Sequence, residues 1–296
     1  MKSINTFQKK ILRSFLKLSS RSPIPSMFFL LGELPIEARI HLNTFSLFYT
    51  IWSNPQTTAH QVVRYILRMA DSSSTTWAAH LRLLCQMYGI SDPLFLIEKE
   101  TPWSKDRWKT LTTTKVIIYH ERQLRSKAAR NSKMDYLNVQ TLGLTGRIHP
   151  AVQNLWTTQD VRKARQHLKF LAGDYLTGEQ LANENGGQPK CKLCLAPVET
   201  TAHIIVKCSA LSDVRNRIMP ELLNKISDIQ PTSQVLKNPN SNNLTQFILD
   251  CTSTNLPTEY RISGEHPRVQ EIYKLCRDWC YGIASERTRQ LKLIST

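Results

Sequence analysis

Residues 191–208 read CKLCLAPVETTAHIIVKC and collect three cysteines and one histidine in a short stretch. The spacing is Cys191-x2-Cys194-x8-His203-x4-Cys208. The two-residue gap lets two thiolates from one tight turn reach the same ion, and the longer excursion returns the chain with two further ligands. Four such ligands in a closed tetrahedron are typical of structural Zn²⁺, whereas catalytic zinc keeps a position for water. The pattern therefore predicts a zinc-binding module of the CCHC, or zinc-knuckle, kind.

The residues around these ligands fit a loop that depends on metal. A glycine pair at 186–187 turns the chain before the first cysteine, and the apolar run 204–206 can pack beneath the ion. Because so short a segment buries little area, metal binding would supply its folding free energy, ~10 kcal/mol or more in finger-like peptides. The alternative is three unrelated buried cysteines and a core histidine. A disulfide between Cys191 and Cys194 would leave Cys208 without a role.

The composition bounds the partners and the compartment. The 296-residue chain has 39 Lys and Arg against 23 Asp and Glu, a formal net charge of +16. Such an excess favours polyanionic partners, because Lys and Arg displace counterions from phosphates; the alternative is a basic surface that only keeps the protein soluble. No apolar run approaches the ~20 residues that span a bilayer, so we expect a soluble protein with no membrane partner. Seven cysteines, an odd number, favour a reducing nuclear or cytoplasmic compartment over a disulfide framework.

The N-terminal segment 1–22 contains six basic residues and no acidic one. We expect it to form a surface helix with one buried apolar face. The alternative is a mitochondrial presequence, which is also basic, Ser-rich and amphipathic, although most of the basic residues here are Lys and not Arg. The apolar residues at helical spacing are Ile4, Phe7, Ile11, Leu12, Phe15 and Leu16.

Helical periodicity dominates the rest of the chain, and no clean strand alternation stands out. We therefore expect a mainly α-helical protein in which helices flank the small CCHC zinc-binding module. Helices are predicted at 26–53 with a break at Pro35, at 59–70, at 77–88 before Gly89, at 158–183, at 209–219, and from Pro267 onward. Pro220 is predicted to end one helix or to open the next. Cys276 and Cys280, on the last helix, are predicted to be buried where this helix packs against the rest of the protein.

Four regions follow from this organisation. Residues 1–100 form an N-terminal helical region, and 101–157 a basic helical linker region. Residues 158–228 comprise the zinc-binding module with its flanking helices, and 229–296 a linker and the C-terminal helix.

The stretch 101–133 is the strongest candidate for a nucleic-acid surface outside the zinc module. It holds nine Lys or Arg against two acids, with Trp103 and Trp108 interleaved. Aromatic faces can stack on unpaired bases while cations follow phosphates. The alternative is a solvated helix face with the tryptophans in the core. With a second basic group before the zinc loop, the candidate nucleic-acid contacts are Lys105, Arg107, Lys109, Arg122, Arg125, Arg130, Arg162, Lys163, Arg165, Lys169, Lys190 and Lys192.

Residues 168–218 resemble the C-terminal cysteine–histidine region of non-LTR retrotransposon polyproteins. Three features carry the resemblance: an L-x-G-x-Y-L lead-in at 171–176, the pair Glu199-Thr200 ahead of the histidine, and a helix with Arg215 after the last cysteine. The segment 28–52, FFLLGELPIEARIHLNTFSLFYTIW, is similar to the segment that follows the reverse transcriptase core in such elements.

The resemblance implies that Cys191, Cys194, His203 and Cys208 are the ligands. It also implies that the chain corresponds to the C-terminal third of an RNA-directed DNA polymerase from a transposable element, with 1–100 as a thumb-like region after the polymerase. The family's polymerase needs an aromatic-x-Asp-Asp motif, and no Asp-Asp pair occurs here, so we expect no enzyme activity and no catalytic residue.

The expected function is therefore non-catalytic, zinc-stabilised binding of nucleic acid, RNA or an RNA–DNA junction. The polymerase part of the same polyprotein is a second expected partner. The alternative is a zinc-stabilised helical scaffold that binds protein and has no nucleic-acid role.

Overall fold

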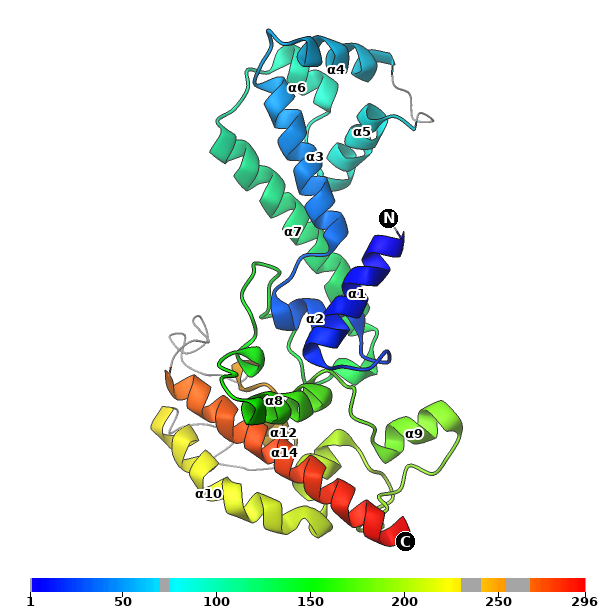
Figure 1. Ribbon diagram of the computed structural model, residues 1–296, viewed down its shortest axis with the longest axis vertical. Helices are drawn as coiled ribbons and strands as arrows, with labels where there is room; N and C mark the ends of the chain where they lie inside the picture. Colours follow the sequence, from blue (N-terminus) through cyan, green and yellow to red (C-terminus); the bar gives the residue numbers. More distant parts are fainter. Residues whose placement is uncertain (1, 70–74, 230–240, 254–266, 296) are drawn as a thin grey trace. The chain divides into compact units, whose positions relative to one another are not determined.

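The computed structural model describes residues 2–69, 75–229, 241–253 and 267–295. Within these ranges the chain is 72% helical and contains no strand, so the prediction of a mainly α-helical protein is confirmed (Figure 1). None of the described helices is both long enough and apolar enough to cross a lipid bilayer.

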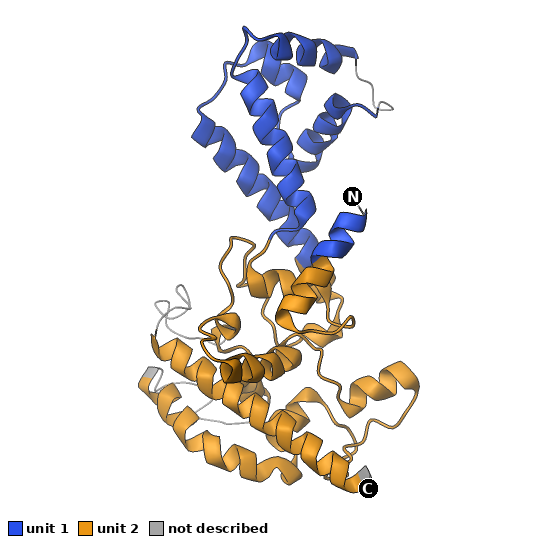
Figure 2. Cartoon of the chain, in the orientation of Figure 1, with its two compact units in different colours: residues 1–8, 34–124 blue, residues 9–33, 125–296 orange. Residues whose placement is uncertain are grey.

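The chain divides into two compact units, which Figure 2 shows in different colours. Unit 1 comprises residues 1–8 and 34–124, and unit 2 comprises residues 9–33 and 125–296. All four candidate metal ligands belong to unit 2. The division falls inside the first and second of the four regions described above, because an early segment of the chain joins the later one.

Backbone hydrogen bonds tie the early segment 9–33 into unit 2. Gly146 N donates to Gly32 O at 2.9 Å, and His149 N donates to Leu30 O at 2.8 Å. Gly32 has φ +61°, and a Cβ atom there would lie 2.4 Å from the carbonyl oxygen of Arg147. This close approach of two backbones therefore requires glycine.

Unit 1 is a group of helices whose ends follow local sequence signals. Its helices are α3 (Ile36–Trp52), α4 (Thr58–Met69), α5 (Trp77–Tyr88), α6 (Pro93–Lys99) and the first part of α7 (Lys105–Ala129). Pro35 precedes α3, the hydroxyl of Thr76 accepts from Ala79 N at the start of α5, and Gly89 ends α5 in the left-handed conformation. The helix starts and stops predicted at these three places are confirmed.

Trp108 belongs to the core of unit 1. Its side chain is 2% exposed, its indole N–H donates to Phe45 O at 3.0 Å, and its ring packs edge-on against Trp52. Trp103 is half-buried against the same core, with the Arg107 guanidinium 4.6 Å from its ring centre. For Trp108 the alternative prediction is therefore correct: the side chain is buried in the core. Helical periodicity places it on the opposite side of the helix from its exposed basic neighbours.

Helix α1 (Lys2–Leu16) forms where the N-terminal helix was expected, but it buries only part of its apolar residues. Leu12 and Leu16 are buried. The prediction of one buried apolar face is thus correct for one edge of the helix only. The exposed apolar residues are Ile4, Phe7, Ile11 and Phe15.

Unit 2 is organised around its longest helix. Its helices are α2 (Ile24–Leu31), α8 (Thr158–Leu171), α9 (Gly178–Asn185), α10 (Ser212–Ile229), α12 (Ser241–Leu249) and α14 (Pro267–Ser295). The shorter helical turns are η1 (Ser132–Met134), η2 (Pro150–Val152), η3 (His203–Lys207), η4 (Ser209–Leu211) and η5 (Cys251–Ser253). Helices α8 and α10 pack along α14, which also contacts α12 and η3 (Figure 1). Cys276 and Cys280 of α14 are fully buried, as predicted.

Helix α10 continues through Pro220, so the prediction of a helix boundary there is wrong. A proline inside a helix removes one backbone hydrogen bond and costs ~3 kcal/mol or more. Leu222 and Ile226, in the turns that follow, are almost completely buried where α10 packs along α14, whereas Pro220 is exposed. Burial of this face offsets the lost bond. Helix α14 begins at Pro267 as predicted, and most of the linker predicted at 229–242 lies outside the described residues.

Candidate metal centre

The four predicted ligands converge on one point in unit 2. The sulfurs of Cys191, Cys194 and Cys208 and a ring nitrogen of His203 all lie within 4.8 Å of one another. The sulfurs of Cys191 and Cys208 are 3.8 Å apart, and Cys194 Sγ lies 3.3 Å from His203 Nε2. Ligands placed tetrahedrally around zinc are separated by about 3.3–3.8 Å, given metal–ligand bonds of 2.0–2.3 Å. The cluster could therefore hold a metal ion.

A tight turn presents the first two cysteines. Cys191 N donates to Ala196 O at 2.9 Å, and Leu195 N donates to Cys191 O at 3.0 Å while Leu195 takes a left-handed φ of 61°. The backbone N–H groups of Leu193 and Cys194 bond the sulfur of Cys191, and that of Ala196 bonds the sulfur of Cys194. Hydrogen bonds donated to sulfur favour the thiolate, which is the form that binds metal.

A second turn, η3, presents the other two ligands. Thr200 Oγ1 accepts from His203 N at 3.0 Å, and Cys208 N donates to His203 O at 2.7 Å. Ile205 is fully buried, and its carbonyl accepts the indole N–H of Trp279 from α14 at 3.0 Å. The apolar run between the last two ligands thus packs into the core of unit 2 and anchors the turn.

Glu199 fastens the loop between the two turns. Its buried carboxylate accepts from Gly178 N at 2.7 Å and from two nitrogens of Arg287 on α14, at 3.2 and 2.7 Å. Its own N–H donates to Pro189 O at 2.6 Å. A bidentate guanidinium–carboxylate pair is strong and directional. Contacts outside the four candidate ligands therefore also bind the ligand loop to α9 and α14.

Arg215, on α10, lies beside the fourth ligand. Its Nη2 donates to Cys208 O, and its Nη1 is buried with no hydrogen-bond partner among the described residues. A divalent ion bound by three thiolates and a neutral imidazole would form a site with a formal charge of −1, which the neighbouring guanidinium of Arg215 would stabilise. Glu199 thus binds the ligand loop to α9, Thr200 accepts from the N–H of His203, and Arg215 binds the carbonyl of Cys208.

Burial dominates the protonation of the cluster. Burial raises the pKa of Cys208 to about 12, with the negative charge of Cys191 acting in the same direction, and it also raises the pKa of Cys191. At Cys194 burial acts to raise the pKa. Hydrogen bonds from Ala196 N–H and from the neighbouring thiols outweigh burial, so the pKa of Cys194 is lowered. Burial lowers the pKa of His203, which favours the neutral imidazole that binds metal.

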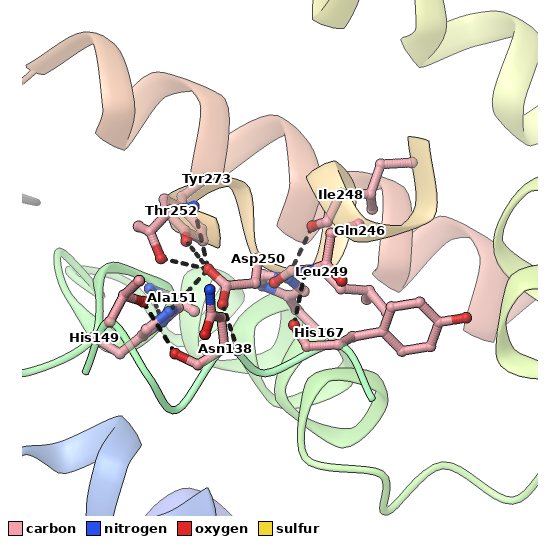
Figure 3. Close-up of polar contacts among 12 residues, drawn as sticks. Asn138, His149, Ala151, His167, Gln246, Ile248, Leu249, Asp250, Thr252 and Tyr273 are labelled. Carbon is pink, nitrogen blue, oxygen red and sulfur yellow. Dashed lines mark hydrogen bonds and ion pairs between the residues drawn. The ribbon is translucent and has the colours of Figure 1, made fainter. Parts of the chain in front are cut away.

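A second polar cluster surrounds Asp250 in the core of unit 2 (Figure 3). The carboxylate is fully buried and accepts from His149 Nε2 at 3.4 Å, from the Tyr273 hydroxyl at 3.4 Å and from Asn138 N at 3.2 Å. The backbone N–H and the hydroxyl of Thr252 donate to it as well. Burial would raise the pKa of Asp250, but these bonds, that of His149 first, hold it below its ordinary value. Since protein donors surround the carboxylate, we assign the cluster a structural role.

His167, on α8, lies close to the same cluster (Figure 3). Its Nε2–H donates to the carbonyls of Ile248 and Leu249 at 3.0 and 2.9 Å, and its Nδ1 is buried with no hydrogen-bond partner among the described groups. Burial, and then the neighbouring His149, lower the pKa of His167 to about 4. Asp250, His149 and His167 were not predicted as a cluster, because each stands alone in the sequence without a spacing signal.

The predicted nucleic-acid contacts fall into two groups. Arg125 donates to Val139 O and Leu142 O at 3.1 and 2.9 Å, and Lys163 pairs with Asp278 at 2.6 Å, so both cations make protein contacts. Lys169 is half-buried. The exposed members are Lys105, Arg107, Lys109, Arg122, Arg130, Arg162, Arg165, Lys190 and Lys192.

Comparison of the chain with protein-family models, with curated proteins and with solved structures finds no match.

Proposed function

We propose that Cys191, Cys194, His203 and Cys208 hold one structural Zn²⁺. Three sulfurs and one nitrogen within 4.8 Å of one another suit the tetrahedral coordination that zinc prefers. Four protein ligands leave no position for a water molecule, so the ion takes no part in a chemical step. It would join the two ligand turns and supply folding free energy that this small loop lacks.

We further propose that this zinc-supported region binds nucleic acid without catalysing a reaction. The observation that carries the proposal is the position of Lys190, Lys192 and Lys207. Each lysine is directly adjacent in sequence to a metal ligand, each is exposed, and none has an ion pair within the described part of the chain. Because the zinc site has a formal charge of −1, the attraction for phosphate comes from these lysines, and the metal holds them in place.

The proposed setting is the non-catalytic C-terminal part of a retrotransposon RNA-directed DNA polymerase. Its ligand would be RNA or an RNA–DNA junction, in the nucleus or the cytoplasm, and the polymerase part of the same polyprotein would be a second partner. The support is the resemblance of residues 168–218 and 28–52 to such polyproteins. The hydrogen bonds of Glu199 with Gly178, of Thr200 with His203 and of Arg215 with Cys208 would explain why these residues accompany the ligands.

Titration of a fluorescently labelled single-stranded RNA at several salt concentrations tests the nucleic-acid function. In the variant Lys190→Glu/Lys192→Glu we expect weaker binding and a slope of log K against log salt that is smaller by roughly 1.4, from two lost phosphate contacts. The matched control is Lys99→Glu/Lys274→Glu, which changes the net charge equally at exposed lysines outside the ligand loop.

Equal weakening in both variants would contradict a specific role of the loop lysines. If the parent protein binds neither RNA nor DNA even at low salt, the nucleic-acid function is wrong and the protein-binding scaffold replaces it.

A further inference from the structure

A cavity of about 340 Å³ lies in unit 2. The turn after α1, helix α8, the segment that follows α8 and helix α14 contribute its lining. These elements come from three widely separated parts of the sequence. The cationic residues that line the cavity are Lys17, Arg21, Arg165, Lys169 and Arg287.

One carboxylate, that of Asp174, lines the same cavity, and protein groups already bind it. Asp174 Oδ2 accepts from Ser19 N at 2.9 Å, and Oδ1 accepts from the Ser19 hydroxyl. Arg287 is paired with Glu199 at 2.7 Å. Arg21 is paired with Glu184 at 4.0 Å, so the single charge of Asp174 is left to face Lys17, Arg165 and Lys169.

Lys17, Arg165 and Lys169 have no ion pair with any carboxylate of the residues that the structure describes. Burial, and then the positive charge of Arg165, lower the pKa of Lys169, although Asp174 acts in the opposite direction. Three cations thus line one partly enclosed cavity, and nearby carboxylates neutralise their positive charge only in part. An anion that entered the cavity would supply the missing negative charge.

Lys17 ends α1 in a left-handed conformation, with φ 54°. Leu18 N donates to Arg13 O at 3.0 Å, and Lys17 N donates to Ser14 O at 3.2 Å. This is the bond pattern of a helix C-terminus whose left-handed residue is most often glycine, because a side chain there is strained. The substitution Lys17→Gly would therefore remove a cavity charge and relieve the backbone at the same time.

Tyr175 also lines the cavity, but its ring is already engaged. It stacks on Phe170 with ring centres 3.8 Å apart, and the Arg287 guanidinium lies 5.6 Å from its centre. The lining thus offers cations to phosphate oxygens and no free face of Tyr175 to a base. Contacts of this kind do not depend on base sequence.

We propose that this cavity is a phosphate-binding site, in which Lys17, Arg165 and Lys169 hold a phosphate group of a nucleic-acid chain. Guanidinium and ammonium groups form charge-assisted hydrogen bonds with phosphate oxygens. The phosphate has two sources, an internal phosphodiester of the strand or its terminal phosphate. That this phosphate belongs to a nucleic acid rests on the function proposed above. The affinity of the cavity for phosphate can be measured without that assumption.

Isothermal titration of the full chain with inorganic pyrophosphate tests the cavity alone. We expect one saturable site in the parent and about tenfold weaker affinity in Lys17→Gly and in Arg165→Gln, since each loses a charge-assisted contact. Lys274→Gln, exposed on α14 and outside the lining, is the matched control and should bind like the parent. Lys17→Gly should melt at the same temperature as the parent or higher, so its weaker binding would not reflect unfolding.

Absence of a saturable site in the parent, or equal affinity in all four proteins, would overturn the inference. Two labelled RNAs, with a 5′-hydroxyl or a 5′-phosphate, then separate the sources. Equal weakening of both by Arg165→Gln assigns the cavity to an internal phosphodiester, and weakening of the 5′-phosphate RNA alone assigns it to the terminus.

The two proposals fail in different ways. If the pyrophosphate site is present but the parent binds no RNA, the nucleic-acid function is wrong and a free phosphate compound is the ligand of the cavity. If Lys190→Glu/Lys192→Glu weakens RNA binding and the cavity variants do not, the nucleic-acid function stands and the cavity has no part in it.

Discussion

The cluster around Asp250 and the candidate metal cluster both belong to unit 2, and opposite principles hold them together. Around Asp250, a single carboxylate meets hydroxyl and N–H donors of the protein, so the groups complement one another. At Cys191, Cys194, His203 and Cys208, like groups converge, and as metal-binding thiolates they would repel one another without a cation. A cluster of complementary groups, such as that around Asp250, indicates a structural role. A cluster of groups that would repel one another indicates a binding site for an ion of opposite charge.

The largest expected effect breaks the metal cluster. Cys191→Ser should lose the ion and with it ~10 kcal/mol of folding free energy, which is comparable with the whole stability of a domain. Elemental analysis should find about one equivalent of zinc in the parent and little in the variant, and circular dichroism should show lost helix. The control is Cys276→Ser, at a buried cysteine outside the cluster, which should keep the metal. Equal zinc contents in the two variants would show that the cysteines do not bind it.

A smaller effect is expected at the cluster around Asp250, in which protein groups hydrogen-bond one another. Asp250→Asn should lower the free energy of unfolding by about 3–5 kcal/mol, because the buried negative charge is lost and an NH2 group replaces one of the two acceptor oxygens. Urea denaturation measures this change, and Asp213→Asn, on the exposed side of α10, should stay within about 0.5 kcal/mol of the parent. The zinc content of Asp250→Asn should equal that of the parent. A lower zinc content in this variant would mean that the two clusters are not independent.

The smallest of the three effects concerns pH. Because burial lowers the pKa of His167 from 6.5 to about 4, the unfolded state binds more protons between these values. The stabilisation is fully present above pH 6.5 and is lost progressively as the pH falls towards 4, with a loss of about 2 kcal/mol at pH 5. Thermal denaturation at pH 7 and pH 5 should show a smaller drop in Tm for His167→Gln than for the parent. Identical drops would exclude His167 as the source.

Local sequence signals predicted what depends on neighbouring residues. The ligand set was predictable because its spacing lies within one loop, so two turns suffice to bring the four side chains together. Helix ends at Pro35, Gly89 and Pro267 followed from proline and glycine geometry in the same way. At Pro220 the same local rule was wrong, since packing of α10 along α14 outweighs the lost bond.

The sequence by itself determined the helical class, the cluster of candidate metal ligands and most helix boundaries, because periodicity, caps and ligand spacing act over a few residues. Only the tertiary structure decided that Glu199 pairs with Arg287, that Asp250 meets His149, and that Lys17 shares a cavity with Arg165. These groups are far apart in the chain, and each is unremarkable where it stands. Their meeting depends on the whole path of the backbone, which no local pattern of residues specifies.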